Sequence, residues 1–217
     1  MQHKNTRDHW EAIYKEKDAE NLSWYEVFPY ISLYIITQLK LSRDAAIIDV
    51  GGGDSHLVDF LLREGYRNIT ILDISQTAIN KAKARLGKQS EDKVNWIVSD
   101  ILDFKPSGTY DFWHDRATFH FLTDENSIGK YVSIAHNAVK EQGHISLGTF
   151  STKGPEVCSG LYIRQYSEDV LSRTFHPFFQ KIRCLNHMHF TPADAEQNFI
   201  FCLFNHQFKH SKHEEYR

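Results

Sequence analysis

Three consecutive glycines lie in the segment Asp49–Ser55, among residues that can contact a ligand. The preceding run, 45–50, is almost wholly apolar, as expected of a strand buried on both faces. Ser55 is suited to cap a helix after the glycines. Without Cβ atoms, glycines let the backbone approach a ligand, and a helix N-terminus offers free N–H groups. The sequence therefore predicts cofactor contacts from four residues of this turn, namely Asp49, Gly51, Gly52 and Gly53.

Two more acids follow the next two predicted strands. Asp73 ends the run 68–73, and Asp100 comes directly after the run 94–99. In parallel sheets the carboxyl ends of the strands share one edge, where ligands bind. A carboxylate at the second strand can accept both hydroxyls of a ribose. We therefore expect an adenosine-containing cofactor at this edge of the sheet.

The residues after the glycines bear on the choice of cofactor. A nicotinamide site usually carries Gly-x-Gly-x-x-Gly, whose last glycine lets helix and strand pack closely. Here Gly51 and Gly53 are succeeded by Asp54, Ser55 and His56, so that last glycine is missing. The pattern favours another adenosine-containing cofactor over NAD.

The fourth predicted strand, 110–114, ends in groups suited to acid–base chemistry. His114 can take a proton, Asp115 can take one or orient a cationic acceptor, and Arg116 can hold an anion. We therefore predict that His114, Asp115 and Arg116 are catalytic. The alternative is structural, with an ion pair between Asp115 and Arg116 beside a hydrogen-bonded histidine.

Strands and helices alternate around these residues. The apolar runs lie at 45–50, 68–73, 94–99, 110–114 and 144–150, with helical patterns between them. This order predicts an α/β fold, a single doubly wound domain with parallel strands and helices on both faces of the sheet. Two long strand-like runs, 179–190 and 199–208, come next, and the short loop between them makes them an antiparallel pair.

The segment Asp49–Ser55 and the acids after it resemble those of the class I methyltransferases that depend on S-adenosylmethionine (SAM). The resemblance covers nearly all of residues 10–208. It implies a Rossmann-like, mostly parallel seven-stranded sheet with an antiparallel C-terminal strand, and SAM as the cofactor. It further implies that Asp49, Gly51 and Gly53 surround the methionine part of SAM, that Asp73 binds the ribose, and that Asp100 and the backbone of Ile101 read the adenine. Ile74, next to Asp73, is also expected to contact the cofactor. Ser55 departs from the family, which has a glycine there.

An aromatic segment precedes the sheet. Trp24-Tyr25-Glu26 resembles the N-terminal Trp-Phe/Tyr segment of several methyltransferase-like protein-lysine enzymes, which folds over the cofactor as a lid. The resemblance implies that Trp24 contacts the cofactor and Tyr25 the substrate, although the segment also suits a helix-packing anchor. We predict three parts, namely an N-terminal helical lid (1–43), a methyltransferase domain (44–208) and a charged C-terminal tail (209–217).

Further substrate contacts are predicted at the same edge of the sheet. A loop containing Gly and Pro comes after the fifth strand and carries Cys158. Loops at this edge commonly line binding sites, so Cys158, Arg164 and His120 are predicted to contact the substrate. His187 and His189 share one face of a strand, but no Cys or carboxylate lies at metal-binding spacing, so we predict no metal.

Composition excludes several protein classes. The 217 residues carry a net charge of −3, which does not favour nucleic-acid binding. No apolar run approaches the roughly 20 residues that cross a membrane, and the polar N-terminus does not look like a signal peptide. The three cysteines, at 158, 184 and 202, show no paired spacing, so we expect reduced thiols in a cytoplasmic protein. The sequence does not set the oligomeric state.

Several functions fit these features. Our leading prediction is transfer of the SAM methyl group to a small-molecule acceptor through nitrogen, oxygen or sulfur, because Asp115-Arg116 resembles the Asp-Arg of thiol-type methyltransferases. The alternative is a protein-lysine methyltransferase, indicated by the segment at Trp24. More remote alternatives are an NAD-type oxidoreductase and a nucleotide-binding module without turnover.

Overall fold

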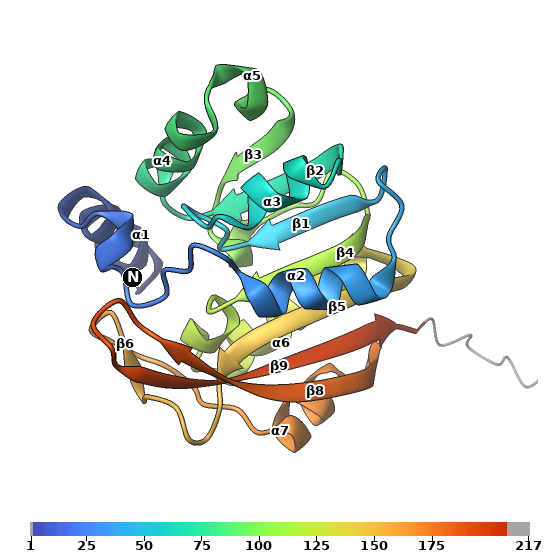
Figure 1. Ribbon diagram of the computed structural model, residues 1–217. Coiled ribbons are helices and arrows are strands. Elements are labelled where there is room, and N and C mark those ends of the chain that lie inside the picture. Colours follow the sequence, from blue (N-terminus) through green and yellow to red (C-terminus); the bar gives the residue numbers. More distant parts are fainter. Residues whose placement is uncertain (1, 208–217) are drawn as a thin grey trace, which may run out of the picture.

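The chain forms one seven-stranded sheet flanked by helices (Figure 1). The computed structural model describes residues 2–207, with side chains from residue 6 onward. Neighbouring strands follow the order β3-β2-β1-β4-β5-β9-β8. Their bounds in that order are Val94–Val98, Asn68–Asp73, Ala46–Val50, Tyr110–Arg116, Val139–Phe150, Glu196–His206 and Phe179–Phe190. The pairs from β3 to β5 are parallel and β9 is antiparallel to both neighbours, which confirms the expected Rossmann-like sheet.

Helices cover both faces of this sheet. Figure 1 shows α2 and α3 in front of the sheet and α6 behind it. The helices and short elements are α1 (Gln2–Glu16), η1 (Ala19–Asn21), α2 (Tyr30–Leu39), α3 (Leu57–Arg63), α4 (Gln76–Leu86), α5 (Lys88–Glu91), η2 (Ile101–Asp103), η3 (Phe119–Phe121), α6 (Glu125–Ala138), the hairpin β6 (Val157–Cys158) and β7 (Leu161–Tyr162), and α7 (Glu168–Phe175). None of the helices in the described part of the chain is long and apolar enough to span a membrane.

The helix starts follow from local capping chemistry. Ser75 accepts a hydrogen bond from the Ala78 amide and Ser167 accepts one from the Val170 amide, as expected of N-cap residues. Ser55 behaves differently from the sequence expectation. Its hydroxyl accepts from the Leu57 amide at 3.2 Å, but His56 stands between it and the first residue of α3.

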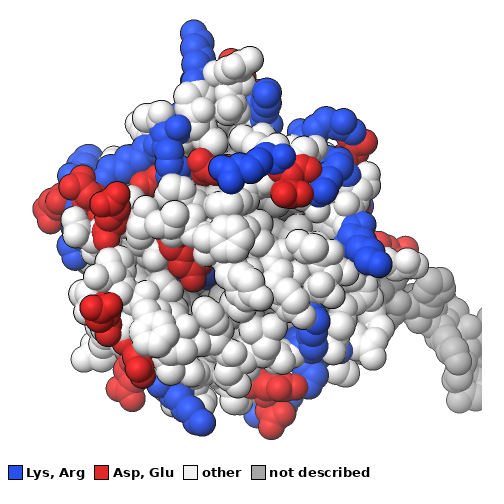
Figure 2. All heavy atoms as spheres, in the orientation of Figure 1, with Lys and Arg blue, Asp and Glu red and all other residues white. Residues whose placement is uncertain are grey.

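The face over α2 carries few charges in its middle (Figure 2). Phe28, Tyr30 and Tyr34 are large exposed hydrophobic residues at the start of this helix. On the opposite side of α2, Ile35 and Ile36 are buried in the same apolar cluster as Ile47 of β1. Because α2 packs into the core, it forms part of the main domain. The lid predicted over residues 1–43 thus includes a helix of the core, and the lid itself stays a prediction.

Two other expectations concern the ends of the chain and the cysteines. The predicted tail, 209–217, lies outside the described residues. The expectation of reduced thiols is wrong for Cys184 and Cys202, which form a disulfide between β8 and β9. Strand register places these two residues directly opposite each other, and their separation of 18 residues gives no hint of that pairing. Cys158 is a free, buried thiol.

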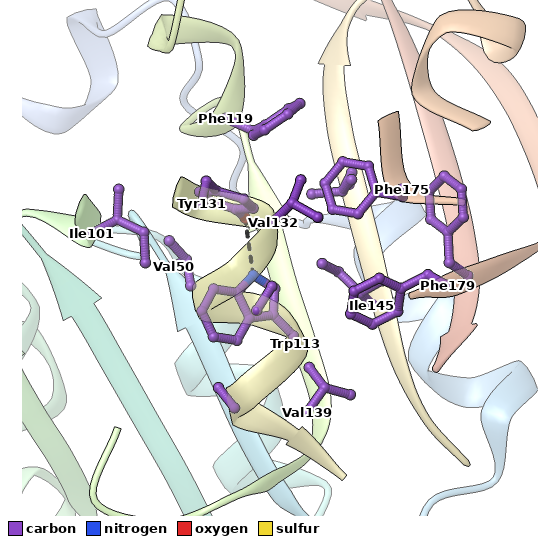
Figure 3. Close-up of a cluster of buried hydrophobic side chains, with 14 of the residues drawn as sticks. Val50, Ile101, Trp113, Phe119, Tyr131, Val132, Val139, Ile145, Phe175 and Phe179 are labelled. Carbon is purple, nitrogen blue, oxygen red and sulfur yellow. Dashed lines mark hydrogen bonds between the residues drawn. The ribbon is translucent and has the colours of Figure 1, made fainter. Parts of the chain in front are cut away.

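The core behind the sheet contains a buried hydrogen-bonded chain. Trp113 Nε1 donates to the Tyr131 hydroxyl at 2.9 Å, and that hydroxyl donates to Asp115 Oδ2 at 2.6 Å. Figure 3 shows Trp113 and Tyr131 linked among apolar neighbours that include Phe119 and Ile145. All three polar residues are fully buried, so each depends on the others for hydrogen bonds.

We predict that Tyr131→Phe lowers the free energy of unfolding by about 2–4 kcal/mol, because both Trp113 and Asp115 would lose a buried partner. Urea unfolding followed by circular dichroism measures this change. Tyr166→Phe is the matched control. Tyr166 is also fully buried, but its hydroxyl makes no hydrogen bond to the described residues, so its removal is expected to change stability by less than about 1 kcal/mol. Equal effects of the two substitutions would contradict this prediction.

Candidate cofactor and methyl-acceptor site

A cavity of about 690 Å³ lies at the carboxyl ends of β1, β2, β3 and β4. This volume is typical of sites that bind small molecules and cofactors. Its lining comes from the sheet edge, from α1, from the loop after β4 and from the β6–β7 hairpin. The lining includes His9, Trp10, Tyr14, Trp24, Gly51, Asp73, Ile74, Asp100, Ile101, Arg116, Thr118, Phe121, Asp124, Cys158 and Tyr162.

The glycine turn is held in a conformation that requires glycine. Gly51 has φ +68° and Gly53 has φ +37°, both in the left-handed region. A Cβ on Gly51 would lie 1.7 Å from Thr118 Oγ1, and a Cβ on Gly52 would lie 2.7 Å from Asp49 Oδ2. Only Gly51 of the three glycines lines the cavity. The turn therefore needs glycine partly for its own packing, as well as for backbone access to a ligand.

Asp49 supports the turn from inside the protein. It is 3% exposed, does not line the cavity, and its Oδ1 lies 2.7 Å from His114 Nδ1. Asp49 therefore does not reach the cavity wall, and its contact with the cofactor stays a prediction. Gly52 and Gly53 do not line the cavity either, and a Cβ added to them would face Asp49 and Asp73, respectively.

Asp73 lies at the end of β2 and lines the cavity with Ile74. Its Oδ1 accepts a hydrogen bond from the Ser75 amide at 2.7 Å. Burial raises the pKa of Asp73 to about 7. The hydrogen bond from the Ser75 amide opposes this increase, and the nearby charge of Asp49 adds to it. A ligand that donates hydroxyl groups to this carboxylate would relieve its lack of hydration.

Asp100 and Ile101 lie at the end of β3, also on the cavity wall. Asp100 Oδ1 accepts from the Leu102 amide at 2.9 Å and thereby caps the short helix η2. The structure thus brings together the second and third acids that the sequence placed at one sheet edge. Their spacing across adjacent parallel strands suits the ribose and base of one nucleoside.

His114 and Asp115, two of the three predicted catalytic residues, do not line the cavity. His114 is 2% exposed and its two ring nitrogens contact Asp49 and the Ser32 hydroxyl. Asp115 is fully buried, and its Oδ1 accepts from the amides of Thr118 and Phe119. Burial raises the pKa of Asp115 to about 6, although the Tyr131 hydroxyl and these amides lower it. The two residues position the glycine turn and the loop after β4.

Arg116, the third predicted catalytic residue, does line the cavity. Its Nη2 donates to the Trp24 carbonyl at 2.8 Å, and its Nη1 lies 3.3 Å from Glu26 Oε2. The ion pair with Asp115 that the sequence suggested is therefore replaced by one with Glu26. These contacts place Trp24 on the cavity wall, as expected of a lid, whereas Tyr25 does not line the cavity and contacts the His56 ring.

The other predicted substrate residues are dispersed. Cys158 lines the cavity, and burial raises the pKa of its thiol to about 11. His120 does not line the cavity, and burial lowers the pKa of its ring to about 3. Arg164 also lies away from the lining and pairs with Glu125 at 2.6 Å. The structure thus brings only Cys158 of these three residues to the site.

Several cavity residues were not predicted from the sequence. Trp10 and Tyr14 reach the cavity from α1, and Phe121 reaches it from η3. Trp10 packs edge-to-face on both Trp24 and Phe121, at ring-centroid distances of 5.7 and 5.0 Å. His9 also lines the cavity, and its Nε2 has no hydrogen-bond partner among the described residues. The sequence spacing of Trp10 and Tyr14 places them on one side of a helix, but it does not show which part of the fold they contact.

The donor set fits SAM. Two carboxylates at adjacent strand ends, a glycine turn against the cavity and an aromatic wall can accept ribose hydroxyls, approach the methionine part and cover the base. The fold and the cavity together define a class of protein, a Rossmann-like enzyme that binds a nucleoside cofactor.

Comparison with known proteins narrows this class. Residues 47–143 match the family model described as "Methyltransferase domain". EEF1A lysine methyltransferase 2 of Mus musculus is 28% identical over 138 residues, covering 58% of this chain and 56% of that protein. Malonyl-[acyl-carrier protein] O-methyltransferase 1 of Ilyobacter polytropus is 28% identical over 135 residues, covering 59% of this chain and 48% of that protein. The chain spans about half the length of both relatives.

Solved structures show the same fold. A 1,6-didemethyltoxoflavin-N1-methyltransferase of Burkholderia thailandensis, bound to S-adenosylhomocysteine, aligns with a TM-score of 0.71 at 15% identity, covering 95% of this chain and 86% of that one. A SAM-dependent methyltransferase of Anabaena variabilis aligns with a TM-score of 0.72 at 13% identity, covering 94% and 96%. The chain thus shares the fold of SAM-dependent methyltransferases, and residues 47–143 match a methyltransferase domain.

Proposed function

We propose that this protein transfers the methyl group of SAM to an amine nitrogen, with the side chain of a protein lysine as the favoured acceptor. The observation that carries this proposal is the charge of the cavity. Three carboxylates line it, Asp73, Asp100 and Asp124, against one guanidinium, that of Arg116. Glu26 already pairs with that guanidinium. The cavity therefore favours cationic ligands and disfavours a carboxylate acceptor.

The aromatic wall adds a second requirement of amine methylation. Trp10, Trp24 and Phe121 surround the cavity with apolar surface. Such surface disfavours the charged form of an amine and promotes the loss of its proton, which must precede attack on the methyl group. His9, which lines the same cavity, is the side chain that we propose accepts this proton. When bound, SAM supplies the electrophilic methyl group.

The relatives also support a lysine acceptor, because proteins named as lysine methyltransferases are among them. A small-molecule amine is the second candidate, as our sequence interpretation favoured a small acceptor. It is supported by the cavity volume of about 690 Å³, which lies within the range of small-molecule sites. A cytoplasmic location stays a proposal, and the disulfide between Cys184 and Cys202 removes the support that reduced thiols gave it.

We predict that radiolabelled SAM and this protein label the protein fraction of a cell lysate, and that the label withstands mild base. Prior chemical acetylation of the lysines in the lysate is expected to abolish the labelling, because an amide nitrogen is not nucleophilic. The variant His9→Gln is expected to retain S-adenosylhomocysteine binding but to lose at least about tenfold in rate, the usual contribution of a proton acceptor being about 100-fold or more. Label found only in small molecules would select the second candidate, and base-labile label would contradict an amine acceptor.

A further inference from the structure

The segment that carries Trp24 is fastened to the sheet by charged groups at its C-terminal side. Glu26 contacts two side chains from different strands. Arg116 Nη1, at the end of β4, lies 3.3 Å from its Oε2, and His189 Nδ1, near the end of β8, lies 3.3 Å from its Oε1. The three side chains are 16%, 10% and 5% exposed, respectively, so water weakens these contacts little.

His189 also contacts the segment at a second point. Its Nε2 lies 2.7 Å from the carbonyl oxygen of Ser23. The carbonyl can only accept a hydrogen bond, so Nε2 must carry a proton. His189 and Arg116 thereby hold both ends of the four residues 23–26, because Arg116 binds the Trp24 carbonyl as well as Glu26.

The other ring nitrogen of His189 faces Glu26, whose charge follows from its surroundings. Burial would raise the pKa of Glu26, but the charge of Arg116 and the hydrogen bond from His189 outweigh it and lower the pKa. Glu26 is thus a carboxylate, which can only accept a hydrogen bond. The contact of Nδ1 with Glu26 is an ion pair only when the ring is protonated, and both ring nitrogens then donate.

We propose that His189, as an imidazolium, is a positioning residue that latches the segment 23–26 and so holds Trp24 on the cavity wall. Protonation of His189 and closure of the segment then favour each other, because the neutral ring can satisfy only one of its two acceptors. Imidazole changes its charge between about pH 5 and 8, so closure is expected to be strongest at acidic pH. The charged and titratable groups facing this ring are Glu26, His187 and Arg116.

Hydrogen exchange of the protein without ligand tests the latch. The Tyr25 amide donates to the Leu22 carbonyl at 3.0 Å and reports on the segment. Its protection factor, which corrects for the chemical effect of pH, is expected to fall by about tenfold from about pH 6 to about pH 8.5, the effect of losing one charge-assisted hydrogen bond. Amides of α7 are expected to keep their protection factors. A protection factor at Tyr25 that does not change with pH would overturn the proposal.

Two substitutions separate a latch from a general structural role. His189→Arg keeps a permanent cation with several donors, and it is expected to make the protection of the segment independent of pH. His189→Gln is expected to give low protection at both pH values. His187→Gln is the control for nearby charge, because His187 interacts electrostatically with Glu26 and His189 but makes no hydrogen bond to residues 23–26 in the described structure; it is expected to keep the pH dependence. A pH profile for His189→Gln equal to that of the unaltered protein would also overturn the proposal.

Calorimetry with S-adenosylhomocysteine tests whether the latch affects the cofactor site. Any effect of the latch on catalysis rests on the proposed function. The affinity is expected to fall with rising pH in the unaltered protein, and to fall less steeply once His189 is arginine. Absence of S-adenosylhomocysteine binding at every pH would count against the proposed function alone, since the exchange experiment needs no ligand. A pH dependence of affinity unaltered by His189→Arg would count against the latch alone.

Discussion

Gly51→Ala is expected to lower the free energy of unfolding by about 2–5 kcal/mol and to abolish measurable binding of S-adenosylhomocysteine. A non-glycine residue with φ +68° costs roughly 1–2 kcal/mol. The added Cβ would also lie 1.7 Å from Thr118 Oγ1, and such overpacking costs typically about 1–3 kcal/mol. Because Thr118 lines the cavity, its displacement alters the site itself. Urea unfolding and calorimetry measure the two effects.

Gly65→Ala separates the two contributions. Gly65 has φ +85°, but a Cβ there would meet nothing within 4 Å. This substitution is therefore expected to cost about 1–2 kcal/mol and to leave ligand binding unchanged. In the Gly51→Ala background, Thr118→Ala is expected to recover part of the stability by removing the clashing hydroxyl. Equal costs for the substitutions at 51 and 65 would show that the contact with Thr118 is unimportant.

Asp73→Asn is expected to weaken S-adenosylhomocysteine binding by about 1–3 kcal/mol, or roughly 10- to 100-fold, because an amide presents one acceptor oxygen where the carboxylate presents two. Asp103→Asn, an exposed acid at the end of η2, is the control and should bind like the unaltered protein. Isothermal titration calorimetry measures both variants. An unchanged affinity of the Asp73 variant would mean that the cofactor does not contact this carboxylate.

The raised pKa of Asp73 also determines how the stability of the protein and its binding of S-adenosylhomocysteine depend on pH. Its pKa in the folded protein is about 7, above the ordinary value of 3.8, so the folded state holds this proton more tightly than the unfolded state. The unaltered protein is therefore expected to lose about 2–4 kcal/mol relative to Asp73→Asn as pH rises from about 4 to 7. Binding favours the ionised form, so the contribution of this carboxylate to affinity should fall below about pH 7, and binding near pH 6 should release a proton. Thermal unfolding of both proteins across this range tests the sign.

The sheet edge could be predicted from the sequence because its signals are local. A buried strand ending in glycine, and two further strands ending in acids, locate Gly51, Asp73 and Asp100 without knowledge of the rest of the fold. The roles of His114 and Asp115 could not be predicted in this way. Alternating strand residues point to opposite faces, but which face meets the cavity depended on where Ser32 and Tyr131 lie in the folded chain.

The contribution of the N-terminal segment was predictable only in outline. The aromatic residues around Trp24 suggested a lid, and the structure adds Trp10 and Tyr14 from α1 to the same wall. The contacts that hold this wall come from β4 and β8, through Arg116 and His189. Pairings between residues so far apart in the chain have no periodic signature, and the same reason hid the disulfide between β8 and β9.

The hydrogen bond from α2 to His114 bears on how this protein can be dissected. Ser32 Oγ lies 2.9 Å from His114 Nε2, whose other nitrogen contacts Asp49 beneath Gly52. A truncation that removes residues 1–43 would therefore strand a buried histidine and expose Ile47, rather than merely open the site. The cofactor turn and α2 form one cooperative folding unit, and a shortened protein that keeps its fold must retain α2.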